Sequence, residues 1–495
     1  MREYYFGRNR AYFRSGLVLV QGSKVAFSRP TRDTLANHLR YVLLVLPLLL
    51  ALVSWLAFPS LAQWLSINVF GYRPVFQPSR FLWHALVVFY YSWFTFLGIG
   101  MGGLMLVLAW LSRRCTRREK MDFYPMVSFV VPAFNEEKQL PRCINSLFKC
   151  GEEYSGPVEV VVVDDGSDDN SYEIAFASLQ LNAKTHPRIR GRIVRHMTNL
   201  GKVDALTTGA NRAMGQLIAV VDADSWWRKD ALKNLVEYMR TNGKAAATGY
   251  IHPTDYDEEN NPYVILQQVE YSQGLAVFRC AQALGNAVLV VPGAMGLFDA
   301  EVLRDILNRE ALKSVTEDSE ITLELQKKGY KVGYLNDARS TTLAPSDFAS
   351  FWSQRLRWFA GWLHNTFGIH RDVLGETRWL SLLLWYCMIF EYFGAFVELG
   401  AIISFPFLLW FAPDRILFVL NLLWFVSYAL LIGAVLQAAA LRFAYGDYNH
   451  KHLLYYTPFY PILWFINLWA RLFSMAGYAV GRRGRWHPLK QRTVR

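Results

Sequence analysis

The 495-residue sequence has few charged side chains and few cysteines. Charged residues make up 19% of the chain and hydrophobic residues 53%, a composition that excludes disorder and is too apolar for an ordinary soluble protein. The cysteines are odd in number and form no C-x-x-C pair, so neither a disulfide framework nor a zinc site is predicted, and a reducing compartment is consistent with them. They are Cys115, Cys143, Cys150, Cys280 and Cys387.

Long apolar stretches are abundant and lie near the two ends of the chain. Each is long enough for a hydrocarbon core that needs about 20 apolar residues. The first 30 residues contain five arginines but no long apolar core with a small-residue cleavage site, so a removable signal peptide is not predicted. The stretches are Tyr41–Phe58, Phe81–Ser112, Trp379–Pro413, Ile416–Leu441 and Leu453–Val480.

The formal net charge of +12 is concentrated in the terminal segments. Residues 1–40 carry eight basic and two acidic side chains, and residues 481–495 carry six basic and no acidic ones. Because both segments adjoin apolar stretches, the headgroups of membrane lipids on the cytoplasmic face explain this charge better than nucleic acid does.

The charges also predict a topology. Four arginines between residues 113 and 118 follow the second apolar stretch, so we expect the N-terminus and the central region to be cytoplasmic. A cytoplasmic, basic C-terminus then requires one of the three later stretches to lie in the membrane interface or to re-enter. Leu453–Val480, interrupted by Pro458 and Pro461, is the stretch we expect to do so.

Between about residues 125 and 345, short β-rich runs alternate with amphipathic helical patterns. This alternation predicts an α/β domain with a mainly parallel sheet and helices on both faces. The expected strands are Val127–Val131, Val158–Val163, Arg192–Arg195, Leu217–Val221, Ala245–Tyr250 and Val288–Val291. The expected helices are Glu137–Lys149, Asn170–Leu181, Val203–Met214, Lys229–Met239, Tyr263–Cys280 and Asp318–Lys328.

Acidic residues follow three of the expected strands. The first strand opens into Pro132 to Glu136, the second ends at Asp164-Asp165, and the fourth ends at Asp222-Ala223-Asp224. Ligands of open α/β sheets bind beyond the carboxyl ends of the strands, and a D-x-D pair can direct two hard oxygen ligands to Mg²⁺ or Mn²⁺. One such aspartate alone could equally be a turn former or a helix cap.

Three further motifs carry weaker local signals. Lys202 opens an expected helix, where a lysine and backbone amides can contact phosphate. Thr316-Glu317-Asp318 begins another helix, where an acid pair can be a cap or a catalytic base. Gln354, Arg357 and Trp358 share one face of an amphipathic stretch, as ligand-binding residues or as part of an interfacial Trp/Arg belt.

Together, D-D-G-S at 164–167, D-A-D at 222–224, T-E-D at 316–318 and Q-R-L-R-W at 354–358 resemble the ordered motifs of processive family 2 glycosyltransferases. These enzymes are the membrane synthases of cellulose, chitin, hyaluronan and poly-N-acetylglucosamine. The chain is most similar to the poly-N-acetylglucosamine synthase group, through Gln268 to Ser272, Gly285-Asn286 and Arg483 to Trp486. It differs at 291–294, where Val-Pro-Gly-Ala replaces the usual Ser-Gly pair of that group.

The resemblance implies a GT-A (Rossmann-like) fold and a role for each motif. The nucleotide-sugar would contact Pro132, Glu136, Asp165, Lys202, Asp222, Gln354 and Arg357, with Asp222 and Asp224 holding the metal. Asp318 would be the catalytic base, and Trp358 and Glu317 would contact the acceptor. Such chemistry needs one base and positive charge on the departing diphosphate, without a second nucleophile.

The expected function is therefore that of an inverting, metal-dependent processive β-glycosyltransferase in the plasma membrane. Its partners would be a UDP-sugar donor (UDP-N-acetylglucosamine or UDP-glucose), the growing polysaccharide and membrane lipids, with room for a small accessory membrane subunit. The alternatives are a glycosyltransferase that adds one sugar to a lipid acceptor and a nucleotide-regulated transporter. In this view a cytoplasmic GT-A domain (125–345) is inserted between transmembrane helices at 41–112 and membrane or interfacial helices at 379–480. Basic segments 1–40 and 481–495 and an interface helix at 346–370 complete the chain.

Overall fold

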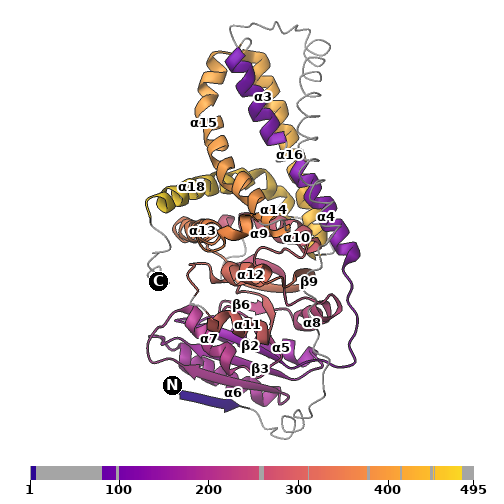
Figure 1. Cartoon of the computed structure of the whole chain (residues 1–495), viewed down its shortest axis with the longest axis vertical. Helices are drawn as coiled ribbons and strands as arrows, with labels where there is room; N and C mark the ends of the chain where they lie inside the picture. The colour runs from indigo at the N-terminus through magenta and orange to yellow at the C-terminus, as the bar shows by residue number, and fades with distance from the viewer. Residues whose placement is uncertain are drawn as a thin grey trace.

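The computed structural model describes residues 2–6, 81–95, 100–255, 261–309, 312–375, 379–412, 415–445, 450 and 452–481. Several predicted segments lie outside the described residues: most of the basic segment 1–40, the apolar stretch Tyr41–Phe58, and the basic tail after residue 481. The described part consists of a sheet domain, a middle layer of helices and a group of long apolar helices (Figure 1).

The sheet domain contains a mixed sheet of nine described strands in the order β1-β4-β3-β2-β5-β8-β7-β9-β6. Strands β4, β3, β2 and β5 are parallel, and β7 is parallel to β9, whereas β1, β8 and β6 pair antiparallel with their neighbours. The strands are β1 Arg2–Phe6, β2 Val127–Ala133, β3 Val158–Asp164, β4 Ile189–Arg195, β5 Leu217–Val220, β6 Ser225–Trp227, β7 Ala246–Thr254, β8 Gly296–Asp299 and β9 Val332–Leu343.

Helices cover both faces of the sheet, as the sequence predicts. β2 and β3 are buried along their whole length. Since alternate residues of a strand point to opposite faces, Val161 and Val163 pack with Ala205 of α7, whereas Val160 and Val162 join the main core. The helices of this domain are α5 Leu140–Glu153, α6 Ser171–Thr185, α7 Lys202–Arg212, α8 Ala231–Thr241, α11 Ala300–Arg309 and α12 Glu317–Lys327.

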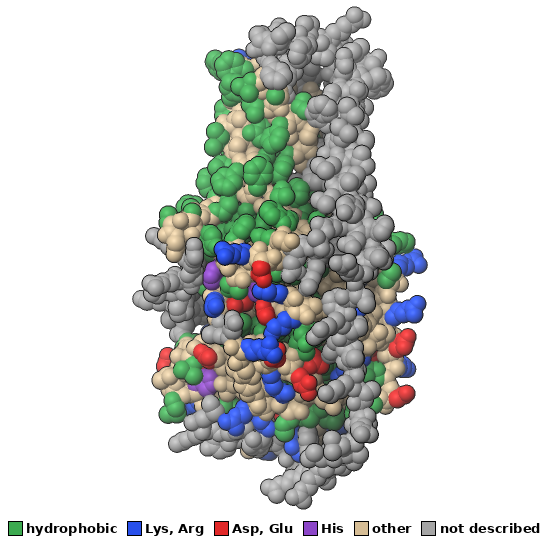
Figure 2. All heavy atoms as spheres, viewed as in Figure 1, with side chains coloured by type: hydrophobic (Ala, Val, Ile, Leu, Met, Phe, Trp, Pro, Cys, Tyr) green, Lys and Arg blue, Asp and Glu red, His purple; other side chains and the backbone are tan. Residues whose placement is uncertain are grey.

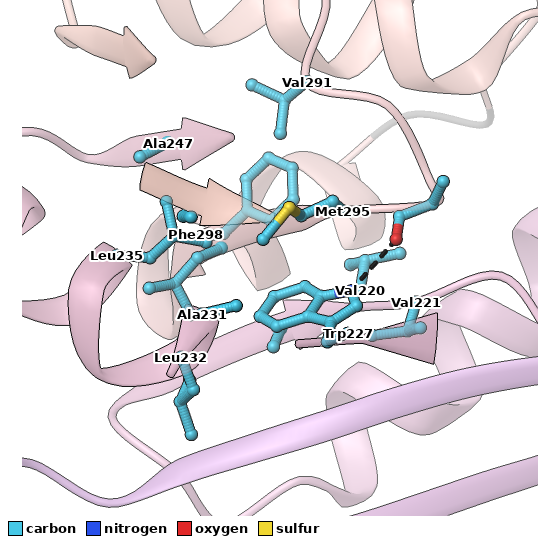
Figure 3. Packing of buried hydrophobic residues seen from close by; sticks show 14 of the residues in the cluster. Val220, Val221, Trp227, Ala231, Leu232, Leu235, Ala247, Val291, Met295 and Phe298 are labelled. Atoms are coloured by element: carbon cyan, nitrogen blue, oxygen red, sulfur yellow. Dashed lines mark hydrogen bonds between the residues drawn. The ribbon is translucent and has the colours of Figure 1, made fainter. Parts of the chain in front are cut away.

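The core continues beneath β5, β7 and β8 (Figure 3). Trp227 contacts Phe129 edge to face, with ring centroids 5.4 Å apart, and packs in the same cluster as Met295 and Phe298. Its indole Nε1 donates a hydrogen bond of 3.0 Å to the carbonyl of Ala294. This bond ties the loop before β8 to the sheet.

The predicted strand at Val288–Val291 is wrong. Ala287 makes one isolated bridge to Val332, but the following residues are irregular and the strand of this region is β8. Side chains satisfy the backbone here: Gln326 donates to the carbonyl of Val288, and Val291 N–H donates to the hydroxyl of Thr322. The sheet is also mixed rather than mainly parallel. The sequence analysis does not predict β1, β6, β8 or β9, and every antiparallel pairing of the sheet involves β1, β6 or β8.

A middle layer of helices lies over the sheet domain (Figure 1). One continuous helical run, α9 Pro262–Gln273, η4 Gly274–Arg279 and α10 Cys280–Leu284, corresponds to the single helix predicted over 263–280. The layer also contains α13 Phe348–Leu363, η5 His364–Ile369, η6 Arg371–Gly375, α17 His452–Tyr456, η8 Thr457–Phe459 and α18 Tyr460–Ala479. Helix α13 packs on α18, and α18 lies across the lower ends of the long helices.

The remaining described helices are strongly apolar. Two are long and apolar enough to cross a membrane, Leu380–Trp410 and Phe418–Tyr445, and α3 contributes a shorter apolar segment, Ala85–Phe94. Hydrophobic side chains cover the surface of this part, whereas charged ones gather on the sheet domain (Figure 2). The elements are α3 Phe81–Thr95, α4 Gly102–Cys115, α14 Trp379–Cys387, η7 Met388–Phe393, α15 Gly394–Trp410 and α16 Arg415–Tyr445.

Candidate active site

The acidic residues predicted at strand ends belong to adjacent parallel strands. β2 pairs in parallel with β3 on one side and with β5 on the other. Glu136 follows β2, Asp165 follows β3, and Asp222 and Asp224 follow β5. Because the carboxyl ends of neighbouring parallel strands meet at one edge, these side chains surround the place where such sheets bind ligands.

Lys202 joins two of the predicted acidic motifs. It is the first residue of α7 and follows Gly201, whose φ of 101° is a conformation that favours glycine. Its Nζ lies 2.8 Å from Asp222 Oδ1 and 2.7 Å from Glu317 Oε1. Burial opposes the charge of this amine, but the two carboxylates outweigh burial and raise its pKa above the ordinary range. The two carboxylates therefore favour the charged form of Lys202 between D-A-D and T-E-D.

Asp165 fixes the segment that leads to Lys202. Its Oδ1 accepts hydrogen bonds from the backbone N–H of Leu200 (3.0 Å) and pairs with His196 Nδ1 (2.7 Å), and its Oδ2 accepts one from the N–H of Gly201 (2.7 Å). The side chain is almost fully buried. The predicted contact with the nucleotide would have to use the acceptor capacity that these bonds leave.

The D-A-D pair has the chemistry of half a metal site. Asp224 Oδ1 accepts hydrogen bonds from the hydroxyls of Ser225 (3.1 Å) and Thr342 (3.4 Å). Burial and the nearby charge of Asp222 raise the pKa of Asp224 to about 6, and a cation would relieve that repulsion. Among the described residues, no group of three or more His, Cys, Asp or Glu side chains is arranged to hold a metal ion. Two carboxylates nonetheless suffice for a cation whose other ligands are substrate phosphates and water.

The T-E-D motif begins α12. Burial raises the pKa of Asp318 to about 6, and the charge of Glu317 adds to this rise. For Glu317 itself, burial is outweighed by Lys202 and, more weakly, by Arg357, so its pKa is lowered. The pKa values of the two adjacent acids thus differ: Lys202 favours the ionised form of Glu317, whereas Asp318 can exchange a proton at a pH near 6.

Helix α13 brings the Q-R-L-R-W motif against T-E-D. A Cβ built at Gly361 would lie 2.3 Å from the hydroxyl of Thr316, so the backbone of α13 packs directly against the Thr316 side chain. Beyond the end of α13, Asn365 donates a hydrogen bond of 3.2 Å to the same hydroxyl and another to Ser319. These contacts set the distance between the helix and the carboxylates.

The predicted residues of α13 differ in environment. Arg357 is exposed and contributes to the potential at Glu317, and Trp358 is half-buried. Gln354 Oε1 is buried and accepts no hydrogen bond from the described residues. Arg355, which lies between Gln354 and Arg357 in the sequence, has a structural environment: it is buried, pairs with Glu270 of α9 (3.2 Å), and lies 4.5 Å from the Trp358 ring.

Pro132 and Glu136 complete the predicted set. Pro132 is buried within β2, beside Val163 of β3. The backbone N–H of Glu136 donates a hydrogen bond of 2.6 Å to the hydroxyl of Ser171. The contacts predicted between these two residues and the nucleotide remain predictions.

Sequence reasoning missed several residues of this site. His196, Gly293, Thr342, Gly361 and Asn365 all contact a predicted motif residue. Gly293 lies against the D-A-D motif, because a Cβ there would lie 2.7 Å from Asp222 Oδ1. Only the Val-Pro-Gly-Ala segment gave a signal, as a departure from the pattern of similar chains.

Residues 128–307 match the model of glycosyl transferase family 2. The chain is 27% identical, over 269 residues, to an N-acetylglucosaminyltransferase of a Rhizobium species, covering 53% of this chain and 58% of that protein. It is 25% identical, over 352 residues, to the poly-β-1,6-N-acetyl-D-glucosamine synthase of Staphylococcus epidermidis, covering 69% of this chain and 81% of that protein. Residues 128–307 therefore carry a family 2 glycosyl transferase domain. Its similarity to that synthase confirms the group indicated by the motifs.

A solved structure confirms the GT-A-like fold of this glycosyltransferase. A mannosyltransferase of Pyrobaculum calidifontis, solved with GDP-Man and Mn²⁺, superposes with a TM-score of 0.50 and 18% identity. The match covers 74% of this chain and 99% of that one. At this identity the likeness concerns the fold alone.

Proposed function

We propose that this family 2 glycosyltransferase is an inverting, processive β-glycosyltransferase that polymerises a UDP-sugar and moves the polymer across the membrane. The observation that carries the proposal is the position of Lys202, which contacts both Asp222 and Glu317 and so joins the D-A-D and T-E-D motifs in one site. The similar N-acetylglucosaminyltransferase and synthase make UDP-N-acetylglucosamine the first donor to test.

Each motif then has a chemical role. Asp318 takes the proton from the acceptor hydroxyl as that oxygen attacks the anomeric carbon. Lys202 and Arg357 supply positive charge beside the departing diphosphate. The side-chain oxygen of Gln354, which accepts no hydrogen bond from the described residues, can accept one from the substrate. Trp358 offers an aromatic surface to the acceptor sugar. A single displacement inverts the configuration and requires no second nucleophile.

A divalent cation fits this site. Asp222 and Asp224 would hold it, and Mg²⁺ or Mn²⁺ would supply charge that neutralises the leaving diphosphate. The adjacent, mutually repelling carboxylates support this assignment.

The proposal also includes insertion of the apolar helices into a membrane. The continuous apolar run through α14, η7 and α15 (Leu380–Trp410) and helix α16 support it through their length, and α18 supports the expected interfacial segment by lying across their lower ends. Helix α13 would then lie at the cytoplasmic face, between the carboxylates and the membrane, which is where a nascent polymer would enter.

Product analysis tests the proposal. The purified full chain is incubated with UDP-N-acetylglucosamine or UDP-glucose and a divalent cation, and both UDP release and product size are measured. Asp318→Asn is the matched control, isosteric but unable to act as a base. We expect a polymer from the wild type and none from the control. A single-sugar lipid product would overturn processivity, and absence of UDP release with every UDP-sugar would overturn the donor class.

A further inference from the structure

A basic pocket lies between α4 and α16 and shares no residue with the candidate active site. Its volume is about 400 Å³, within the usual range of small-molecule sites. The described residues that line it are Trp110, Arg113, Arg114, Arg442 and Phe443. They include three cations and no carboxylate.

The arginines are held in place by aromatic rings and backbone. Arg113 donates a hydrogen bond of 2.9 Å to the carbonyl of Phe443, and its guanidinium lies 5.2 Å from the centre of that ring. The Arg114 guanidinium lies 5.1 Å from the Trp110 ring. Arg114 and Arg442 are exposed, so their donors can reach a ligand in the pocket.

The pocket lies at the ends of two apolar helices. Arg113 and Arg114 are in the last turn of α4, and Arg442 is in the last turn of α16. Arginine and tryptophan at such ends are typical of the headgroup region of a membrane. The two helix C-termini carry about half a negative charge each, which three full positive charges outweigh.

We propose that this pocket binds the phosphate-bearing headgroup of an anionic phospholipid in the cytoplasmic leaflet. Arg114 and Arg442 contact the phosphate oxygens, Arg113 contributes charge while bonded to Phe443, and Trp110 packs beside the glycerol region. The proposal rests on the membrane insertion proposed above, but not on the sugar, the polymer or the metal.

Lipid retention tests the site. The full-length protein is placed in nanodiscs of 20% phosphatidylglycerol and 80% phosphatidylcholine, and retained phosphatidylglycerol is counted by native mass spectrometry after transfer to detergent. R114Q/R442Q is compared with R117Q/K120Q, which removes two equal charges from the exposed segment just after α4. We expect retention to fall about 25-fold in the first variant, at about fivefold for each arginine, and to match the wild type in the second.

The outcomes separate the proposals. Equal retention by wild type and R114Q/R442Q would overturn the site, and the single variants, with about fivefold losses each, carry the test if the double variant does not fold. Inorganic phosphate is tested with the protein in pure phosphatidylcholine discs. If it stabilises the protein as strongly as phosphatidylglycerol does, the ligand of the pocket is free phosphate rather than a lipid headgroup. UDP release, measured on the same samples, tests the proposed function separately, because R114Q/R442Q leaves the catalytic residues intact.

Discussion

Replacing Gly293 with alanine should disable the catalytic site while leaving the domain folded. A Cβ at this position would lie 2.7 Å from Asp222 Oδ1 and 3.0 Å from Lys202 Nζ. The backbone has little room to retreat, because the Gly293 carbonyl accepts a hydrogen bond of 2.9 Å from the N–H of Asp222 and the next carbonyl is bonded to Trp227 (Figure 3). The added methyl group must therefore displace the charged side chains.

The magnitude follows from these distances. Ordinary contact begins near 3.4 Å, so the Asp222 carboxylate has to move by about 0.7 Å from its 2.7 Å position. It is the end of a partly exposed side chain, so the stability cost is at the low end of overpacking, about 1 kcal/mol or 2–4 °C in Tm. A displacement of about 1 Å among catalytic groups can cost about 100-fold in rate. We expect a similar loss of kcat/KM.

The assay is UDP release at varied UDP-N-acetylglucosamine, together with thermal unfolding of the same preparation. Gly274→Ala is the matched control, because no atom of the described residues outside its own helical turn lies within 4 Å of a Cβ built there. It should keep full activity and be neutral or slightly stabilised. Gly293→Ala that retains activity within threefold of wild type would refute the reasoning, and so would a loss of the folded state.

The remaining predictions concern protons, metal and a buried ion pair. Asp318 must be ionised to accept a proton, and its pKa is raised to about 6, mainly by burial and further by a neighbouring carboxylate, so kcat should fall as the pH drops through about 6. Asp318→Asn should lower the rate by about 10²–10⁴ and remove this step from the pH–rate profile. EDTA should abolish activity and Mg²⁺ or Mn²⁺ restore it if Asp222 and Asp224 hold a cation, whereas full turnover in chelator would contradict that role. Glu398→Leu should lower the folded yield, because it leaves buried Arg471 without this partner at a cost of about 3–5 kcal/mol, while the surviving enzyme makes product of normal length. Glu398→Leu/Arg471→Leu should recover most of the yield. Shortened polymer with normal yield from Glu398→Leu would refute this.

The fold could be predicted where a strand is a continuous buried apolar run. β2 and β3 were found within two residues of their ends for that reason. β9 could not be predicted, because it carries Asn336, Asp337 and Arg339 and so shows neither a continuous apolar run nor a regular alternation of apolar and polar residues. The apolar run at Val288–Val291 misled for the opposite reason: its composition suits a strand, but distant side chains take its backbone hydrogen bonds.

The site could be predicted as a set of motifs but not as a geometry. Strand-end carboxylates and T-E-D carry their chemistry locally, so Asp222 and Asp318 could be named from the sequence. The contact of Lys202 with Glu317 depends on where α12 packs, and no spacing along the chain encodes that. The same holds for Gly361 and Asn365, ordinary residues that matter only because α13 touches Thr316.

Glu391 and Glu398 show how far periodicity can reach. Their spacing of seven places both on one side of a helical segment. From the sequence this predicts either a polar stripe that lines the polymer path, or Glu391 at headgroup depth with Glu398 bonded to a neighbouring helix. Glu398 is almost fully buried and binds Arg471 of α18 at 2.6 Å, and the carbonyl of Glu391 accepts a hydrogen bond of 3.0 Å from the same guanidinium. The face was predictable because it depends on helix geometry alone. The partner was not, because Arg471 reaches this face only when α18 lies across α15. That contact favours the bond between helices over the lining stripe for Glu398. The half-exposed carboxylate of Glu391 lies 3.7 Å from the same guanidinium, so Arg471 ties both acids to α18.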